Sequence, residues 1–317
     1  MGMAARRITG DAAATVVIVT KDRRDDALRA VESAAAQRPA VQVLVMDDGS
    51  TDGTADVIRE AFPQVKVERF DESEGYIVRR NLGAELASGR ILVSIDDDAE
   101  MPADDVVAST VADFDEPEIG AVAMPYVDLP DETVRQRAPA ADGAYLVHRF
   151  RGTAYAVRRD VFLAVGGFRE TLFHQAEEAD FCVRLIDAGK VVRLGRAEPI
   201  RHHASPTRSP ERAWFYECRN GVLFAWHNVP MPQLVLHLVK TTLHALWLGR
   251  GVRRTALFAR GLAAGFAAAA RERRSRRAVD SAAWTLYRRL GRETLRLEDV
   301  REQVASREFV PRSSAPA

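Results

Sequence analysis

Residues 91–98 read Ile-Leu-Val-Ser-Ile-Asp-Asp-Asp, and this stretch decides the fold. Its first five residues are mostly branched and apolar, which predicts a short strand buried on both faces of a sheet. Three carboxylates follow at once, and because they repel one another, a folded protein seldom groups them without a cation or an arginine nearby. Hard divalent ions prefer oxygen ligands and often bridge to substrate phosphates. The stretch therefore predicts a buried strand that ends in a metal site, with an acidic surface turn as the alternative.

The residues before this stretch alternate between strand and helix patterns. Strands are expected at 15–20, 41–46 and 65–70, and helices at 25–37, 54–61 and 77–87. Strand–helix–strand units at this spacing predict a parallel sheet with right-handed crossovers. Ligands bind such sheets at the carboxyl ends of the strands. We therefore expect Thr20, Asp48 and the carboxylates of 96–98 to meet at one edge.

After Pro102 the pattern loosens and then becomes helical. We expect, in order, a strand at 118–125, a loop at 128–142, a strand at 144–158 with Gly152 in its middle, helices at 161–165 and 176–188, and a strand at 199–201. From Pro210 onward helix follows helix, with breaks at Pro230, Pro232, Gly249 and Gly251. The chain is therefore predicted to be an α/β protein with a mostly parallel sheet flanked by helices and an all-helical C-terminal extension.

Composition and charge agree with a folded protein of two unlike parts. The 317 residues are 47% hydrophobic and 28% charged, which excludes global disorder. Residues 1–205 hold 25 basic and 36 acidic side chains, whereas residues 206–290 hold 15 basic and four acidic ones. The acidic part suits a protein that gathers carboxylates around a metal. The basic part suits contact with an anionic surface, with solvated helix faces as the alternative.

The cysteines and the apolar runs indicate in which cellular compartment the protein is expected. Cys182 and Cys218 are too far apart for a zinc motif and are expected to be reduced and buried. The N-terminal residues lack the apolar core of a signal peptide, and no uninterrupted apolar run reaches the length of about 18 residues that a spanning helix needs. We therefore expect a cytoplasmic protein.

Further polar clusters are candidates for the site. Asp48 ends a buried strand, where a carboxylate can bind a nucleoside, whereas Ser50 and Asp52 are expected to cap the helix that begins near Thr54. The run 177–180 carries three carboxylates, which could include a base that removes a proton or could simply favour a helix N-terminus. The pair 202–203 is two histidines, which can ligate a metal.

In their order along the chain, these motifs resemble those of the family 2 glycosyltransferases, which have the GT-A fold. The resemblance extends over residues 14–228. The matching segments are Val16–Arg23, Val45–Thr54, Arg80–Gly83, Ala87–Gly89, Ile95–Asp98, Arg158-Arg159, Val165–Phe168, Glu177–Asp180 with Arg184-Leu185, and His202.

The resemblance implies a role for each matched site residue. Thr20, Asp22 and Asp48 would contact the nucleoside, with Arg80 and Asp97 also on the donor side. Asp96 and Asp98 would form the Asp-x-Asp motif that holds a divalent metal, Mg²⁺ or Mn²⁺, and the diphosphate. His202 would complete the metal site, with His203 as the alternative. The base would be Glu178, which stands where the family usually has Asp, so Glu177 and Asp180 stay open as alternatives.

The implied activity is that of an inverting glycosyltransferase (a hexosyl- or deoxyhexosyltransferase). A sugar would pass from a nucleotide-diphosphate donor to the hydroxyl of a glycan, lipid-linked or small-molecule acceptor. A weak or inactive binding protein of the same fold is the main alternative, because the extra methylene of a Glu at 178 moves the carboxylate by about one carbon–carbon bond and a misplacement of about 1 Å can be costly. A sugar nucleotidyltransferase is disfavoured because Thr20–Arg24 lacks glycine, and a dinucleotide dehydrogenase because no Gly-x-Gly-x-x-Gly follows a strand. No nucleic-acid partner is expected.

The expected domains follow from these patterns. Residues 1–13 are a tail, 14–208 the GT-A catalytic domain, 209–308 a helical extension and 309–317 a disordered tail. Within the catalytic domain, 14–101 would bind the nucleotide and 102–208 the acceptor. The segment Trp214–Asn220 resembles one in family members that act on lipid-linked or polymer acceptors. The extension could therefore touch the inner face of a membrane peripherally, or pack against the catalytic domain or in a homodimer.

Overall fold

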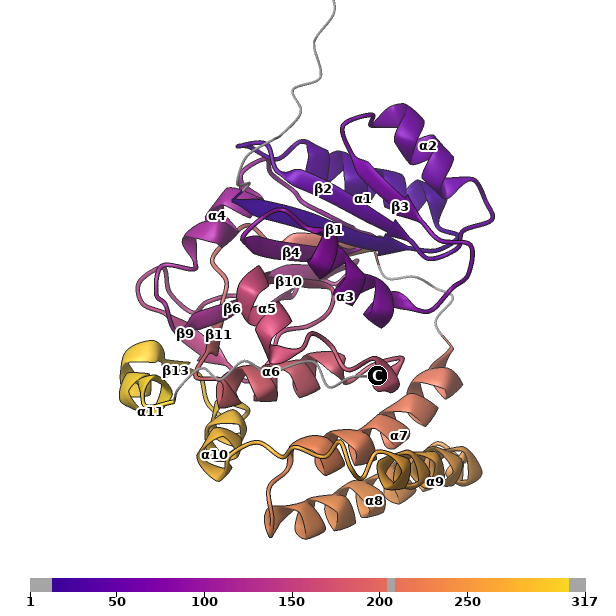
Figure 1. Ribbon diagram of the computed structural model, residues 1–317, viewed down its shortest axis with the longest axis vertical. Helices are drawn as coiled ribbons and strands as arrows, with labels where there is room; N and C mark the ends of the chain where they lie inside the picture. The colour runs from indigo at the N-terminus through magenta and orange to yellow at the C-terminus, as the bar shows by residue number, and fades with distance from the viewer. Residues whose placement is uncertain (1–12, 204–208, 308–317) are drawn as a thin grey trace, which may run out of the picture.

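The computed structural model describes residues 13–203 and 209–307, and a nine-stranded sheet runs through it (Figure 1). The strand order across this sheet is β13 (Leu295–Arg296), β9 (Tyr145–Val147), β11 (Val191–Leu194), β6 (Ile119–Ala123), β10 (Ala154–Arg158), β4 (Ile91–Asp96), β1 (Ala14–Thr20), β2 (Gln42–Asp47) and β3 (Lys66–Arg69). The run from β4 to β3 is parallel, and β10 is antiparallel to β4. The carboxyl ends of β1, β2 and β4 therefore meet at one edge.

A second, four-stranded sheet lies beside that edge. Its order is β5 (Ala99–Glu100), β12 (Ile200–His203), β7 (Tyr126–Leu129) and β8 (Val134–Arg135). The strand β12 pairs antiparallel with β5 and parallel with β7. Because β5 follows β4 after a two-residue turn, this small sheet brings β12 next to the carboxylates at 96–98.

Helices cover the main sheet and form the C-terminal part. They are α1 (Arg24–Ala35), α2 (Thr54–Ala61), α3 (Tyr76–Leu86), α4 (Val106–Ala112), α5 (Arg159–Val165), α6 (Glu177–Asp187), α7 (Pro210–Asn228), α8 (Gln233–Gly251), α9 (Thr255–Arg271), α10 (Ser281–Leu290) and α11 (Arg301–Ala305), with 3₁₀ turns at Glu170–Leu172 and Leu297–Asp299.

The strand β1 shows why this sequence forms a central strand. Val16 and Ile18 are fully buried in the same apolar cluster as the inner face of α1, whereas Val17 belongs to a separate cluster on the opposite face. The helix α3 approaches this second face at Gly83, where a Cβ atom would lie 2.7 Å from Val17 Cγ1. A continuous apolar run is therefore required, because both faces of the strand are covered.

The predicted α/β class is confirmed, and so is the C-terminal helical region, which comprises α7–α10. Three details were wrong. The expected loop at 128–142 contains β8, which pairs with β7. The expected strand at 144–158 is two strands, β9 and β10, because the chain leaves the sheet around Gly152. Gly249 lies inside α8, where it packs against Phe258 of α9.

The C-terminal region is tied to the body at several points. The helix α7 packs along α8 and α9, α10 packs against α6, and β13 adds an edge strand to the main sheet. The predicted tails, 1–13 and 309–317, lie outside the described residues apart from position 13. Among residues 13–203 and 209–307, no helix combines the length and apolarity that crossing a bilayer requires.

Asn220 of α7 should be important for holding α7 to the body. Its buried amide donates to the carbonyl oxygens of Leu172, His174 and Gln175, at 2.9, 2.7 and 2.9 Å. Replacing it with leucine keeps the bulk and leaves these carbonyls without the donor, so Asn220→Leu should lower the free energy of unfolding by about 2–3 kcal/mol in urea titrations. Ser306→Ala removes an exposed hydroxyl-to-carbonyl bond and should change it by less than about 0.5 kcal/mol. Equal midpoints for Asn220→Leu and the unmodified protein would contradict this role.

Candidate active site

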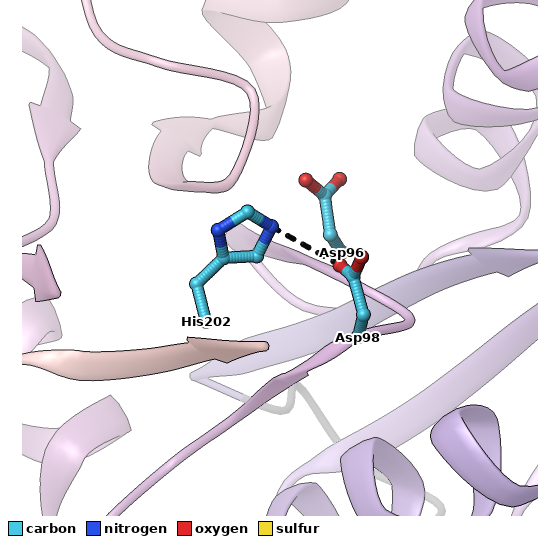
Figure 2. A group of neighbouring side chains, drawn as sticks. All are labelled: Asp96, Asp98 and His202. Atoms are coloured by element: carbon cyan, nitrogen blue, oxygen red, sulfur yellow. Dashed lines mark ion pairs between the residues drawn. The ribbon is translucent and has the colours of Figure 1, made fainter. Parts of the chain in front are cut away.

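Two carboxylates and an imidazole meet where the two sheets join (Figure 2). Asp96 ends β4, Asp98 lies in the turn before β5, and His202 lies on β12. One potential ligand atom from each lies within 4.8 Å of the other two. The convergence of 96 and 98 that the sequence predicts is therefore present, and β12 supplies the histidine.

His202 is held by a carboxylate on each side. Its Nδ1 lies 2.6 Å from Asp128 Oδ1, and its Nε2 lies 3.2 Å from Asp98 Oδ1. Burial alone would lower the pKa of His202, but Asp98 and Asp128 raise it above its usual value. A carboxylate that binds the second nitrogen fixes the ring of a metal-binding histidine in the same way. His203 points to the other side of β12, toward Glu100, as the alternation of a strand requires.

Asp98 meets the requirement for a metal ligand. Its Oδ1 is buried and accepts no well-aligned hydrogen bond from the described residues. Burial would raise the pKa of Asp98, but His202 and Arg23 lower it, so the group is a carboxylate. Two carboxylates and an imidazole are a donor set that suits a divalent ion with open positions for substrate oxygens.

Asp97 faces the first strand rather than the histidine. Thr20 Oγ1 donates to its Oδ2 at 2.8 Å, and Arg23 donates to its Oδ1 at 2.6 Å. The same arginine reaches Asp98 Oδ2 at 3.0 Å. Burial raises the pKa of Asp97 to about 6, against the opposing charge of Arg23. Arg23 thus forms ion pairs with two of the three carboxylates.

Asp48 and Asp22 both accept hydrogen bonds from backbone amides of neighbouring loops. The buried Asp48 carboxylate accepts hydrogen bonds from Ser73 Oγ (2.6 Å), the amides of Glu74 and Gly75 (2.9 Å each) and Arg79 Nε (2.7 Å). Asp22 accepts from the amide of Thr51 at 2.7 Å. These bonds shape the loops after β1 and β2, and nucleoside binding by Asp22 and Asp48 stays a prediction. Asp52 accepts from the amide of Thr54 at 3.0 Å, as expected, whereas Ser50 Oγ accepts from the amide of Asp22 at 2.9 Å and does not cap the helix, contrary to expectation.

Arg80 connects the metal-site carboxylates to α6. The buried guanidinium donates to Asp96 Oδ1 at 2.7 Å and to the carbonyl of Gly152 at 3.0 Å, and it lies 3.7 Å from Glu177 Oε1. The amide of Gly152 in turn donates to Glu178 Oε1 at 2.9 Å. A Cβ atom at position 152 would lie 2.8 Å from that oxygen, so a larger residue would push the Glu178 carboxylate away from this position. Asp96 and Glu178 are thereby joined through two intervening residues.

The three acidic residues of α6 have different surroundings. Asp180 is fully buried and accepts from Arg184 (2.9 Å), Arg169 (3.2 Å) and Asn228 (2.7 Å), and although burial opposes it, these arginines hold its pKa well below the usual value. Glu177 is buried, and burial together with the charge of Glu178 raises its pKa to about 8. Glu178 is half-buried. Of the three, it keeps the most access to solvent.

The loop before α6 is unusual in its backbone. Phe173, Gln175 and Ala176 have φ values of 60°, 66° and 71°, in the left-handed region that costs energy for residues other than glycine. Tyr76 Oη accepts the amide of Gln175 at 2.9 Å, and Asn220 holds the carbonyls on either side. These hydrogen bonds hold the loop in its strained conformation and thereby fix the position of the first turn of α6.

Sequence reasoning missed three residues of this site: Arg23, Tyr76 and Asp128. Arg23 was part of a matching motif without a role. Asp128 fell in an expected loop, although the parallel pairing of β7 with β12 puts it opposite His202. The apolar positions 126 and 127 were the available signal for that strand.

Comparison with known proteins agrees with the site. The model of the family described as glycosyl transferase family 2 matches residues 15–171, a segment that runs from the second residue of β1 through β4 and the Asp96–Asp98 turn and on to the turn before α6. The chain belongs to this family. Two curated relatives are the succinoglycan biosynthesis protein ExoU of Rhizobium meliloti, 36% identical over 86 residues, and a glucosyl-dolichyl phosphate glucuronosyltransferase of Haloferax volcanii, 29% identical over 217 residues.

The alignments with these two relatives cover only part of each protein. The alignment with the first covers 26% of this chain and 25% of that protein, and the alignment with the second covers 59% and 68%. Among solved structures, the mannosyltransferase PcManGT of Pyrobaculum calidifontis, in complex with GDP-Man and Mn²⁺, superposes with a TM-score of 0.55. It is 22% identical, and the match covers 89% of this chain and 84% of that one. At this identity the likeness shows the shared fold.

Asp180 should be important for stability rather than for proton transfer. Asp180→Asn leaves the buried Arg184 and the half-buried Arg169 without their counter-charge, which should lower the free energy of unfolding by about 3–5 kcal/mol. Glu178→Gln, on the same helix but partly exposed, should change it by less than about 1 kcal/mol. Chemical denaturation of both variants checks this, and a loss from Glu178→Gln as large as that from Asp180→Asn would contradict it.

The pKa of Glu177 predicts a pH dependence of stability. Between its ordinary value of 4.5 and about 8, the folded protein keeps a proton on Glu177 that the unfolded chain releases. The folded state therefore loses stability as pH rises through this window, and Glu177→Gln should reduce that loss. Thermal melts in the presence of a chelator, taken across the window for both proteins, measure the difference. Parallel curves would show that Glu177 ionises normally.

Proposed function

We propose that this chain is a metal-dependent, inverting glycosyltransferase that moves a sugar from a nucleotide-diphosphate donor to an acceptor hydroxyl. The observation that carries the proposal is the cluster of Asp96, Asp98 and His202, linked through Arg80 and Gly152 to Glu178. A diphosphate-binding metal centre and a candidate base then lie on one connected set of side chains. Family membership supports the same reaction class.

The metal ligands proposed are Asp98 and His202, with Asp96 in support. A bound Mg²⁺ or Mn²⁺ would neutralise the charge that develops on the leaving diphosphate. Asp128 orients the imidazole of His202 toward Asp98, and Arg80 orients Asp96. On the donor side, Thr20 and Arg23 fix Asp97, while Asp22 and Asp48 shape the two loops that would bind the nucleoside.

Glu178 is proposed as the base. It would take the proton of the acceptor hydroxyl while that oxygen attacks the anomeric carbon and the bond to the diphosphate breaks on the opposite face. Its partial exposure supports this role, since an acceptor must reach it. Asp180 is enclosed by two arginines and Asn228, and Glu177 is buried beside Arg80, so both are better suited to positioning.

A binding protein without catalysis is the competing function, and the glutamate at 178 is the observation that favours it. A donor screen with Mg²⁺ and with Mn²⁺, following released nucleoside diphosphate, separates the two. The proposed enzyme releases nucleotide only with a divalent ion and a cognate donor, faster with acceptor present. Donor binding without any release, in the presence of either metal, would leave the binding protein as the better account.

Two variants should separate metal binding from proton removal. Asp98→Ala should lose donor binding and transfer together, because the diphosphate loses the ion that holds it. Glu178→Gln is nearly isosteric and should keep the donor Kd within about threefold while kcat falls about 100-fold or more. Turnover by both variants at the unmodified rate would end this assignment.

A further inference from the structure

The outer face of α8 is apolar and exposed to solvent. Five large side chains are each about half exposed or more: Val235 (57%), Leu236 (59%), Val239 (49%), Leu243 (62%) and Trp247 (69%). At about 100° per residue these positions fall within an arc of about 120° on the helix. Scattered exposed apolar residues are normal, but a continuous stripe of this length marks an interaction surface. We call these five residues the α8 stripe.

The charged side chains of α8, of α9 and of the turn between them are all basic, and Glu211 of α7 pairs with Arg254 at 3.5 Å. Between Glu217 and Glu272 the sequence has no acidic residue, whereas it has seven basic ones. Lys240 and Arg250 fall on or beside the same arc of α8, and Arg253 follows in the turn after the helix. All three are exposed. An apolar stripe flanked by Lys240, Arg250 and Arg253 is complementary to a surface that is apolar inside and anionic outside.

The combination of apolar and basic side chains favours an anionic lipid surface over a second copy of the chain as the partner. A twofold-symmetric dimer through this face would bring each basic border against its own copy, with no carboxylate in α8 or α9 to compensate. A lipid interface instead offers anionic headgroups to the arginines and acyl chains to the stripe. The most exposed member is a tryptophan, the residue type that membrane interfaces favour.

The arrangement in the fold suits a helix that lies along a surface. Figure 1 shows α8 at the end of the molecule away from β1–β3, on the outside of α7. The hydropathy of α8 falls short of what spanning requires, so burial of one face is the expected mode. On its inner side α8 packs on α7, whose Asn220 holds the loop before α6. Docking would thus fix the orientation of α6, the helix that carries the proposed base Glu178, relative to the membrane.

We propose that the α8 stripe, with Lys240, Arg250 and Arg253, is a docking surface for an anionic lipid bilayer, on which α8 lies parallel to the membrane plane. The proposal does not depend on the reaction, because binding requires neither donor nor metal.

The test is co-sedimentation of the full chain with vesicles, in a chelator and without donor. The unmodified protein should sediment with vesicles of phosphatidylglycerol and phosphatidylethanolamine, and less with vesicles of phosphatidylcholine. The double variant Leu243→Glu, Trp247→Glu should bind the anionic vesicles about tenfold more weakly or worse, because two apolar anchors become anionic. The double variant Arg250→Gln, Arg253→Gln should lose roughly fivefold per arginine while it keeps its weak binding to phosphatidylcholine.

Leu163→Glu is the matched control, since Leu163 is an exposed leucine (37%) on α5 of the body, and it should bind like the unmodified protein. Melting curves confirm that the variants fold. The proposal fails if the unmodified protein stays in the supernatant with anionic vesicles, or if Leu243→Glu, Trp247→Glu binds as tightly as Leu163→Glu. It also fails if the chain is a dimer without lipid that Leu243→Glu, Trp247→Glu dissociates, because a second copy is then the partner.

Discussion

The buried guanidinium of Arg80 is the interaction on which the rest of the site depends. A charge removed from water must be paired, and here the partners come from three separate parts of the chain: Asp96, the carbonyl of Gly152 and Glu177. The rings of Tyr76 and Tyr155 lie 5.0 and 5.7 Å from it. Pairing this one cation brings the end of β4 and the start of α6 together, which sets the separation between the candidate metal site and the proposed base.

The carboxylates of these sequence motifs have different roles because their hydrogen-bond partners and their burial differ. The carboxylate oxygens of Asp48 and Asp180 accept hydrogen bonds from other residues of the protein, so these two side chains hold loops and helices in place. Asp98 has a buried oxygen that lacks a well-aligned donor among the described residues, and Glu178 is partly open. Some acidic residues of these motifs therefore hold loops and helices in place, whereas Asp98 and Glu178 are the ones that we propose to contact ligands.

Sequence patterns predicted the strands of the N-terminal part of the sheet well and those after residue 102 less well. The apolar runs gave β1, β2 and β4 to within a residue or two, and the rule that ligands bind at the carboxyl ends of strands brought Asp96 and Asp98 to one edge. Asp128 could not be placed, because its role comes from the pairing of β7 with β12, which are more than seventy positions apart. The locked state of Asp180 depends likewise on Asn228, in a helix 48 positions away. Such contacts follow from tertiary packing, which no local periodicity encodes.

The most direct measurement is anomalous diffraction at the manganese edge from crystals grown with Mn²⁺ and a nucleoside diphosphate. We expect one strong peak about 2–2.5 Å from Asp98 and from Nε2 of His202, with diphosphate oxygens in the remaining coordination positions. The nucleoside should lie along the loops after β1 and β2, and Glu178 should face the open side of the diphosphate. A peak at another site, or a bound diphosphate with no ion between Asp98 and His202, would contradict this expectation.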